Sequence, residues 1–327
     1  MSKITFLNEP KYSEHETDQV RNAKKKELIP MIEEFVSKHQ LFKDKDVSIS
    51  FSQSGVTSLV SIIESDEEKY VLKTTLTTKP VEGEGMFLKV WEECGVSTPS
   101  VIEEGILNKR PYILMNFIDS ELLGHAYKFN DLISQKTYVD IGQMFSKMHS
   151  KNVKGYGFVR DGNPQYTEFS EWFPNHAAVR LEYIKEHSLL NDTEHGSIED
   201  AIRIIEQYVT ADGRSTYCHN DPSAHNIFAT KPLTVFDPTP SFDHPYMDVG
   251  LAIVLVISEY GSEELVQQFI KGYFDGKEFD QKILHAFVVF NSHRRIPRWH
   301  QTNRPLRIER VKEYLKKNKH LLDLLKS

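Results

Sequence analysis

The stretch that decides the fold is Cys218-His-Asn-Asp-Pro-Ser-Ala-His-Asn-Ile-Phe228, and it is followed by Phe236-Asp-Pro238. Two short β-like runs, Ile227-Phe228 and Val235-Phe236, predict a hairpin between the two stretches. Asp221 and Asn226 lie in the first stretch and Asp237 lies in the second. At this spacing, split by a hairpin, three oxygen-bearing side chains can converge on one point.

Phosphoryl transfer requires such a set: a carboxylate that orients and deprotonates an acceptor hydroxyl, and oxygen ligands that hold Mg²⁺ against the phosphates. The pattern His219-x-Asp221-x-x-x-x-Asn226 resembles the catalytic loop of the aminoglycoside-phosphotransferase and choline-kinase superfamily, whose fold is similar to that of eukaryotic protein kinases. The resemblance implies that Asp221 is the catalytic base and that Asn226 binds Mg²⁺. It also implies that Asp237 is the second metal ligand.

The sequence around this loop extends the resemblance over about 47–273. Asp248 follows a proline-bearing loop and opens an apolar helix, a position that implies a structural brace of the catalytic loop. Upstream, the segment from Ile141 to His149 resembles the family helix that ends in a Met-His pair. His219 is interpreted as structural, with its ring bonded to the backbone of the loop.

The first part of the chain predicts a sheet that carries one helix. From Val47 the apolar residues alternate with a period of two, which predicts three antiparallel strands. A helix follows from about Val81 to Cys94, and two further strands end near Asn116. The resemblance implies that Lys73, on the third strand, binds the nucleotide phosphates.

A helix glutamate should hold that lysine in place through an ion pair. The resemblance assigns this role to Glu84, although Glu82 could serve instead. Ser54 and Gly55 lie between the first two strands, where protein kinases carry a glycine-rich cover, and we expect them to contact the phosphates. Asn116 and Ile118, in the hinge, are the remaining expected nucleotide contacts.

The fold class expected is therefore α+β, a bilobal protein-kinase-like fold with a five-stranded antiparallel N-lobe and a mostly helical C-lobe. We expect three parts in the chain. Residues 1–46 form an N-terminal helical extension, and residues 47–116 form the nucleotide-binding N-lobe. Residues 117–327 form the helical C-lobe, which contains the catalytic loop and the acceptor pocket. The expected ligands are ATP or GTP, Mg²⁺ and a small hydroxyl-bearing acceptor.

Composition excludes several other classes. Hydrophobic residues make up 39 % and charged residues 27 % of the 327 residues, as in ordinary globular proteins. A formal net charge of −7 argues against a nucleic-acid partner. Two cysteines are too few for a disulfide scaffold. The longest apolar run, from Leu251 to Ile257, is too short to cross a bilayer, so we expect a cytoplasmic protein without a membrane partner.

Two alternatives remain open at this stage. The side chains of a His/Asp set could bind zinc, iron or manganese in a metal-dependent hydrolase: His219, Asp221, His225, Asp237, Asp243 and His244. That alternative leaves Lys73 and Glu84 without a role. The chain could also be a non-catalytic nucleotide-binding scaffold with a kinase fold, although each catalytic position carries the expected residue type.

The acceptor is the part of the function that the sequence specifies least. The resemblance makes an aminoglycoside antibiotic possible, and acidic side chains such as Glu259 and Glu263 would suit such a cation. Arg294, Arg295 and Arg298 would instead suit an anion. They open a basic stretch that extends to residue 319 and predicts either a solvated helix face or a patch that contacts an anionic ligand or partner. Three aromatic residues are further candidates for the acceptor pocket: Trp172, Phe173 and Trp299.

Overall fold

The computed structural model describes residues 3–12, 19–53, 58–76, 83–125 and 134–323. The chain divides into two compact units. Unit 1 comprises Met1–Lys89 and Thr98–Asp119, and unit 2 comprises Val90–Ser97 and Ser120–Ser327. Residues 1–46, expected as a separate extension, thus fall within unit 1.

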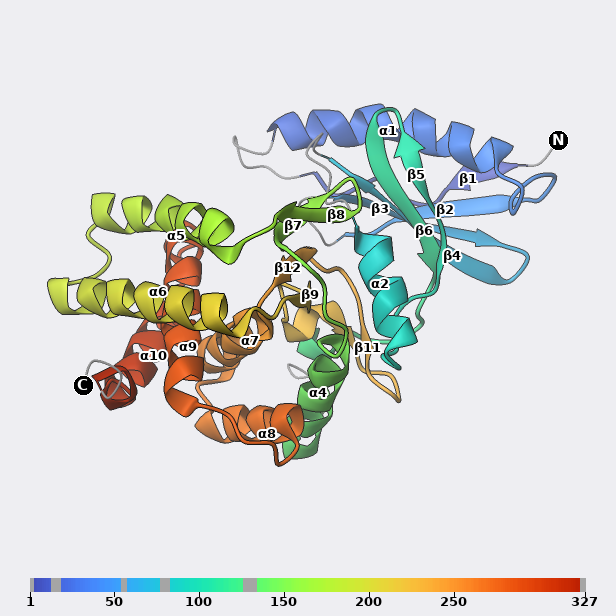
Figure 1. The fold of residues 1–327 in the computed structure, drawn as a ribbon. Coiled ribbons are helices and arrows are strands. Elements are labelled where there is room, and N and C mark those ends of the chain that lie inside the picture. The colour runs from blue at the N-terminus through green and yellow to red at the C-terminus, as the bar shows by residue number, and fades with distance from the viewer. Residues whose placement is uncertain (1–2, 13–18, 54–57, 77–82, 126–133, 324–327) are drawn as a thin grey trace. The chain divides into compact units, whose positions relative to one another are not determined.

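Unit 1 is built on one mixed sheet of six strands in the order β1-β2-β3-β4-β6-β5 (Figure 1). The strands are β1 (Ile4–Phe6), β2 (Val47–Phe51), β3 (Ser58–Ser65), β4 (Glu68–Thr75), β5 (Val101–Leu107) and β6 (Arg110–Asn116). The five predicted strands are confirmed, and their neighbours pair antiparallel. The strand count was wrong, because β1 pairs parallel with β2 at the edge. With three residues, β1 is too short to show a period.

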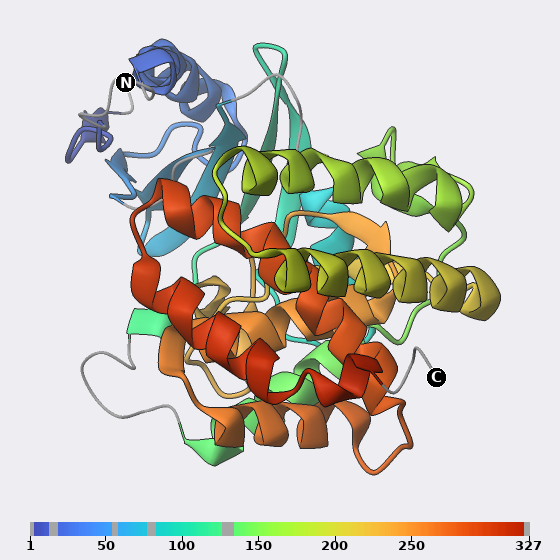
Figure 2. The same cartoon turned by 90° about the vertical axis from the view of Figure 1, so that its left-hand side faces the viewer.

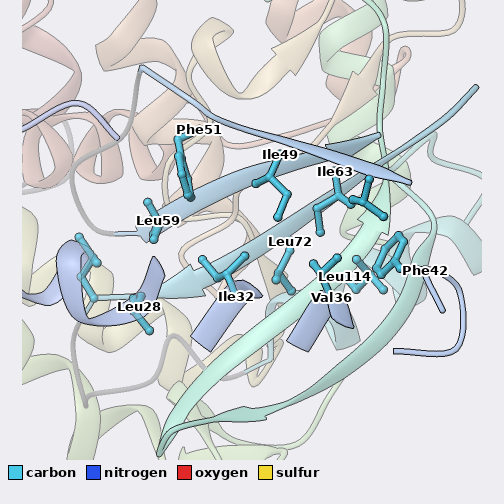
Figure 3. Packing of buried hydrophobic residues seen from close by; sticks show 12 residues of the cluster. Leu28, Ile32, Val36, Phe42, Ile49, Phe51, Leu59, Ile63, Leu72 and Leu114 are labelled. Atoms are coloured by element: carbon cyan, nitrogen blue, oxygen red, sulfur yellow. The ribbon is translucent and has the colours of Figure 1, made fainter. Parts of the chain in front are cut away.

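Helix α1 (Gln19–Lys38) covers one face of this sheet. Its buried stripe of Leu28, Ile32 and Val36 packs on apolar side chains of the strands, among them Ile49 and Leu72 (Figure 3). All five side chains are fully buried. Burying a side chain of this size contributes about 1.5–3 kcal/mol relative to leaving it exposed. The core of unit 1 is therefore apolar, with aliphatic side chains in the majority and the rings of Phe42 and Phe51 among them.

Helix α2 (Glu84–Glu93) lies within the predicted range 81–94. Its first residues belong to unit 1 and its last residues to unit 2. The chain leaves the helix through Gly95, whose φ of +76° lies in the left-handed region that glycine adopts without strain.

Unit 2 is predominantly helical, as predicted. Its helices are α4 (Gln135–Met148), α5 (Phe169–Glu186), α6 (Asp192–Asp212), α7 (Pro245–Tyr260), α8 (Glu263–Phe274), α9 (Gln281–Gln301), α10 (Pro305–Lys317) and α11 (His320–Asp323). Figure 2 shows α5 and α6 side by side, with α9 and α10 in orange to red. Helices α4 and α8 approach closely at Gly142 and Gly272, where an added Cβ would lie 2.2 and 2.1 Å from backbone oxygens of the facing helix.

Short strands complete unit 2. The predicted hairpin is confirmed as β10 (Ile227–Phe228) paired with β11 (Thr234–Val235). A second sheet, in the order β8-β7-β12-β9, was not predicted, and its strands span three to five residues each. These strands are β7 (Tyr156–Arg160), β8 (Asn163–Tyr166), β9 (Thr216–Cys218) and β12 (Ser241–Asp243). In the part of the chain that the structure describes, no helix is both long enough and apolar enough to cross a membrane.

Candidate active site

The predicted catalytic loop connects β9 to β10. It begins at His219, passes through Asn220 in the left-handed region with a φ of 58°, and ends in the 3₁₀ turn Ala224–Asn226. The hydroxyl of Ser223 accepts a hydrogen bond from the backbone N–H of His225 and caps this turn. The loop therefore has a defined backbone before any ligand is considered.

Asp221 and Asn226 are brought together by that turn. Asn226 Nδ2 donates to the backbone oxygen of Asp221 at 2.9 Å and to its Oδ2 at 3.2 Å. Since Nδ2 is engaged in this way, the amide oxygen of Asn226 remains as the group that could bind a cation. The Asp221 side chain is 40 % exposed, so its carboxylate is accessible.

Asp237 follows the hairpin, two residues after the end of β11. The backbone N–H of Phe236 donates to the oxygen of Asn226 at 3.0 Å, which places Asp237 next to Asn226. Asp237 is exposed and its φ of 54° turns the chain sharply at this point. A carboxylate and an amide oxygen are hard donors, so Asn226 and Asp237 fit Mg²⁺ in chemical type.

Asp248, at the start of α7, braces the loop from beneath. Its carboxylate accepts the backbone N–H groups of His219 and Asn220, and His149 Nε2 lies 3.2 Å from its Oδ2. The Asp248 side chain is 1 % exposed. Because two consecutive backbone donors end on one buried carboxylate, the peptide that precedes Asp221 has little freedom to move.

The ring of His219 has a structural role in the same loop. Its Nε2 contacts the backbone oxygen of Phe236 at 3.0 Å, and its ring stacks on Trp91 with centroids 5.6 Å apart. Trp91 Nε1 in turn donates to the backbone oxygen of Tyr217. His219 therefore ties the loop to the backbone of Phe236, the residue before Asp237, which agrees with the structural role expected from the sequence.

Two consecutive arginines of α9 contact the loop, and the sequence did not assign them to it. Arg294 Nη2 donates to Asn220 Oδ1 at 2.9 Å, and Arg295 Nη2 donates to Asp221 Oδ1 at 2.7 Å. The Arg295 side chain is 24 % exposed. The sequence shows the basic residues, but Arg295 and Asp221 are 74 residues apart, so their contact could not be predicted from it.

In unit 1, Lys73 on β4 forms the expected ion pair with Glu84 at the start of α2. Lys73 Nζ donates to Glu84 Oε2 at 2.6 Å, and the two side chains are 12 % and 9 % exposed. The other possible partner, Glu82, lies outside the described residues, as do Ser54 and Gly55.

The two expected hinge contacts both lie in unit 1. Asn116 ends β6, and its side-chain oxygen accepts the backbone N–H of Ser100. Ile118 follows two residues later and is half-buried.

A cavity of about 230 Å³ opens beside Asp221 within unit 2. The loop, α4, α7, α9 and α10 supply its lining. Of the residues suggested for an acceptor pocket, Glu259 and Trp299 line this cavity, whereas Trp172, Phe173 and Glu263 are not among its lining residues. A larger cavity of about 750 Å³ contains none of the candidate site residues among those the structure describes.

The hydrolase alternative required six His and Asp side chains to converge, and they do not. In the described ranges, the three side chains whose potential ligand atoms lie within 4.8 Å of one another are His149, Cys218 and Asp248. Asp243 instead accepts from Trp172 Nε1, and burial raises the pKa of its carboxyl to about 7. The six side chains form no common metal site in the part of the chain that is described.

Comparison with solved structures identifies the fold. A thermostable mutant of aminoglycoside phosphotransferase APH(4)-Ia, in a ternary complex with ADP and hygromycin B, is 14 % identical with a TM-score of 0.60 and 83 % and 94 % of the two chains covered. The GDP complex of aminoglycoside 2'-phosphotransferase-IIIa is 11 % identical with a TM-score of 0.55, covering 88 % and 97 %. Plasmodium vivax ethanolamine kinase is 13 % identical with a TM-score of 0.51, covering 90 % and 84 %.

At these identities the similarity establishes a kinase-like fold and nothing finer. Among curated proteins, none matches the sequence. The model of the phosphotransferase enzyme family matches residues 48–283, which include Lys73, the catalytic loop and Asp248. That range exceeds half of the chain, and the protein therefore belongs to the phosphotransferase enzyme family.

Proposed function

We propose that the protein is a small-molecule kinase, which transfers the terminal phosphoryl group of ATP or GTP to a hydroxyl of a small acceptor. The observation that carries the proposal is the position of Asp221. Its carboxylate is exposed, Asn226 holds it, and it lies at the mouth of a cavity large enough for a small ligand. Family membership supports the same reaction class.

Asp221 acts as the base in this proposal. It accepts a hydrogen bond from the acceptor hydroxyl and orients the hydroxyl oxygen toward the terminal phosphorus. It takes the hydroxyl proton as the new O–P bond forms and the bond between the terminal phosphorus and the bridging oxygen breaks, which releases the nucleoside diphosphate. The Asp248 brace fixes the backbone that carries this carboxylate. Arg295 donates to the same carboxylate, so its guanidinium competes with the acceptor hydroxyl for the lone pairs of Asp221 Oδ1.

Asn226 and Asp237 would hold Mg²⁺ through their side-chain oxygens. When bound, the ion would neutralise the phosphate oxygens of the nucleotide and the charge that develops on them. Lys73 would contact the phosphates as a point charge, and its ion pair with Glu84 keeps its ammonium group in place. Ser54, Gly55, Asn116 and Ile118 remain predicted nucleotide contacts.

Replacing Lys73 with alanine tests the nucleotide part of the proposal. Mg-ATP or Mg-GTP should raise the melting temperature of the wild-type protein, because a ligand that binds the native state stabilises it. In Lys73→Ala a charge-assisted contact is lost, so the nucleotide concentration that gives half the shift should rise by about tenfold or more. The matched control is Lys69→Ala on the same strand, where the lysine is 44 % exposed and pairs with Glu64.

The control variant should bind nucleotide as the wild type does. Equal nucleotide affinity in the wild type and in Lys73→Ala would remove Lys73 from the site. A wild type that no nucleotide stabilises would contradict the kinase proposal itself.

A further inference from the structure

The cavity beside Asp221 has a distinctive charge pattern. Its described lining contains four arginines and two carboxylates, a formal balance of +2 (4 − 2). The arginines are Arg295, Arg298, Arg304 and Arg307, and the carboxylates are Asp221 and Glu259. One histidine, His225, also lines the described part of the cavity. A protein whose net charge is −7 thus places an excess of positive charge around this cavity.

Both carboxylates are already matched by an arginine. Arg295 pairs with Asp221 at 2.7 Å, and Arg307 pairs with Glu259. Arg298 and Arg304 are exposed, and neither forms an ion pair with any residue that the structure describes. Two guanidinium groups therefore remain available to a ligand. A cationic acceptor would meet carboxylates that are already neutralised and two uncompensated positive charges.

The arginines of α10 occupy positions that ordinary helix physics disfavours. Arg304 is the N-cap of α10 and forms no capping hydrogen bond, and Arg307 is at the third helical position, where a glutamate commonly completes the cap. The first turn contains no acidic residue. Positive side chains at the positive end of the helix dipole are destabilising, whereas the same end attracts anions. A ligand with negative charge would remove this conflict.

We propose that the acceptor carries an anionic group, a carboxylate or a phosphate, which binds to Arg298 and Arg304 while its hydroxyl lies at Asp221. This inference rests on the proposed function, because it takes the cavity as the acceptor site. Guanidinium groups suit both anions, since their donors match two oxygens at once. The acceptor is thereby a hydroxy acid or a phosphorylated alcohol, not a polycationic aminoglycoside.

The contact between Arg295 and Asp221 has a consequence under this proposal. The anionic group of the acceptor attracts the Arg295 guanidinium away from Asp221 Oδ1 as it enters the cavity. The base is then released when, and only when, an acceptor of the right charge has bound. Neutral alcohols, including water, leave the pair closed, so the arginines select the acceptor and restrict hydrolysis of the nucleotide.

Binding can be tested without knowing the acceptor. Isothermal titration with inorganic phosphate, at saturating ADP, is carried out on the wild type, on the double variant Arg298→Gln/Arg304→Gln, and on the control Lys316→Gln. Lys316 is exposed at the opposite end of α10 and does not line the cavity. We expect phosphate to bind the wild type and the control equally, and at least about tenfold more weakly to the double variant. Equal binding to all three proteins, or no binding to the wild type, would overturn the proposal.

A panel of acceptors matched in size separates the two anions and the other charge classes. Transfer from Mg-ATP is compared for glucose 6-phosphate, gluconate, glucose and glucosamine. We expect one of the two anionic compounds to have the highest kcat/KM. In the double variant the KM for that compound should rise at least about tenfold, with kcat and nucleotide affinity unchanged. Preference for glucosamine over both anions would refute the inference and leave the kinase proposal intact. Failure of ADP to bind would refute the kinase proposal and leave the phosphate titration as evidence on the arginines.

Discussion

The interiors of the two units are built from different chemistry. Beneath α1, unit 1 buries a large apolar cluster with side chains such as Ile32 and Leu72, and its buried charged side chains, Lys25, Glu84 and Arg110, lie outside that cluster. Around the catalytic loop, unit 2 buries His149, His219 and Asp248, each at most 8 % exposed. Apolar packing tolerates small shifts, whereas a buried carboxylate with several donors has one favourable geometry. The difference indicates that unit 1 is held by its core, and that the loop of unit 2 is held by a polar network.

The largest effect on stability should come from the aliphatic core. Ile32→Ala removes a fully buried side chain from α1, and such truncations cost about 2–5 kcal/mol because they leave a cavity. Chemical denaturation should show unit 1 unfolding earlier, with the helical signal of unit 2 unchanged. The control is Glu33→Ala, an exposed neighbour on α1, which should change stability by about 0.5 kcal/mol or less. If the two variants were equally stable, α1 would not be part of the core.

A smaller stability loss, joined to a loss of activity, should follow from Asp248→Asn. The substitution removes the charge that accepts two backbone donors, and a buried hydrogen-bond defect of this kind costs about 1–3 kcal/mol. Phosphoryl transfer should fall because Asp221 is no longer fixed, while nucleotide still raises the melting temperature through Lys73. Asp140→Asn, on the exposed i,i+4 pair with Lys136, is the control and should be near neutral. Full activity in Asp248→Asn would show that the network does not position the loop.

Acid should act selectively on unit 2, through a loss of stability that builds up gradually over several pH units. Burial lowers the pKa of His244 and His285 to about 4 and that of His293 to about 3. These groups stay neutral in the native state, so their contribution is present above the unfolded pKa near 6.5 and is lost as pH falls through the folded values. Asp243, whose pKa is raised to about 7, opposes this trend between pH 4 and 7. Because three histidines act in one direction and one carboxyl acts in the other, the net effect of acid is a loss of stability.

The measurement is the free energy of unfolding at several pH values between 6.5 and 4.5. His285→Gln removes one titrating group, so the slope of stability against pH should decrease by up to about 1.4 kcal/mol per pH unit. The contrary result would be an unchanged slope, or a first acid transition in the aliphatic core of unit 1.

Sequence patterns predicted the parts of the structure whose signal is local. The stripes of α4, α6 and α8 and the alternation in β2 to β4 repeat over enough residues to reveal their period. The three-residue strands β1 and β9 are too short to show a period and were missed. Their existence depends on partners far along the chain, for example the pairing of β12 with both β7 and β9.

The same distinction applies to the candidate site. Asp221 and Asn226 were paired correctly because five residues and one turn connect them. Arg295 was interpreted as part of a basic stretch and as suited to an anionic acceptor. Its contact with Asp221 was missed, because that contact requires α9 to pack against the loop. Whether the cavity beside Asp221 suits a cation or an anion was undecided for the same reason. From the sequence, Glu259 is a candidate to bind a cation, and only the structure shows that it pairs with Arg307.

Transfer of labelled phosphate by Asp221→Asn tests the central claim most directly. The wild type, supplied with γ-labelled ATP or GTP, Mg²⁺ and an acceptor from the panel, should move the label into an organic product, and EDTA should abolish the transfer. Asp221→Asn keeps the shape of the side chain and removes its negative charge, so transfer should fall by at least about a hundredfold. Mg-nucleotide should still raise its melting temperature. Transfer at the wild-type rate in Asp221→Asn would contradict the account, because Asp221 would then not be the base.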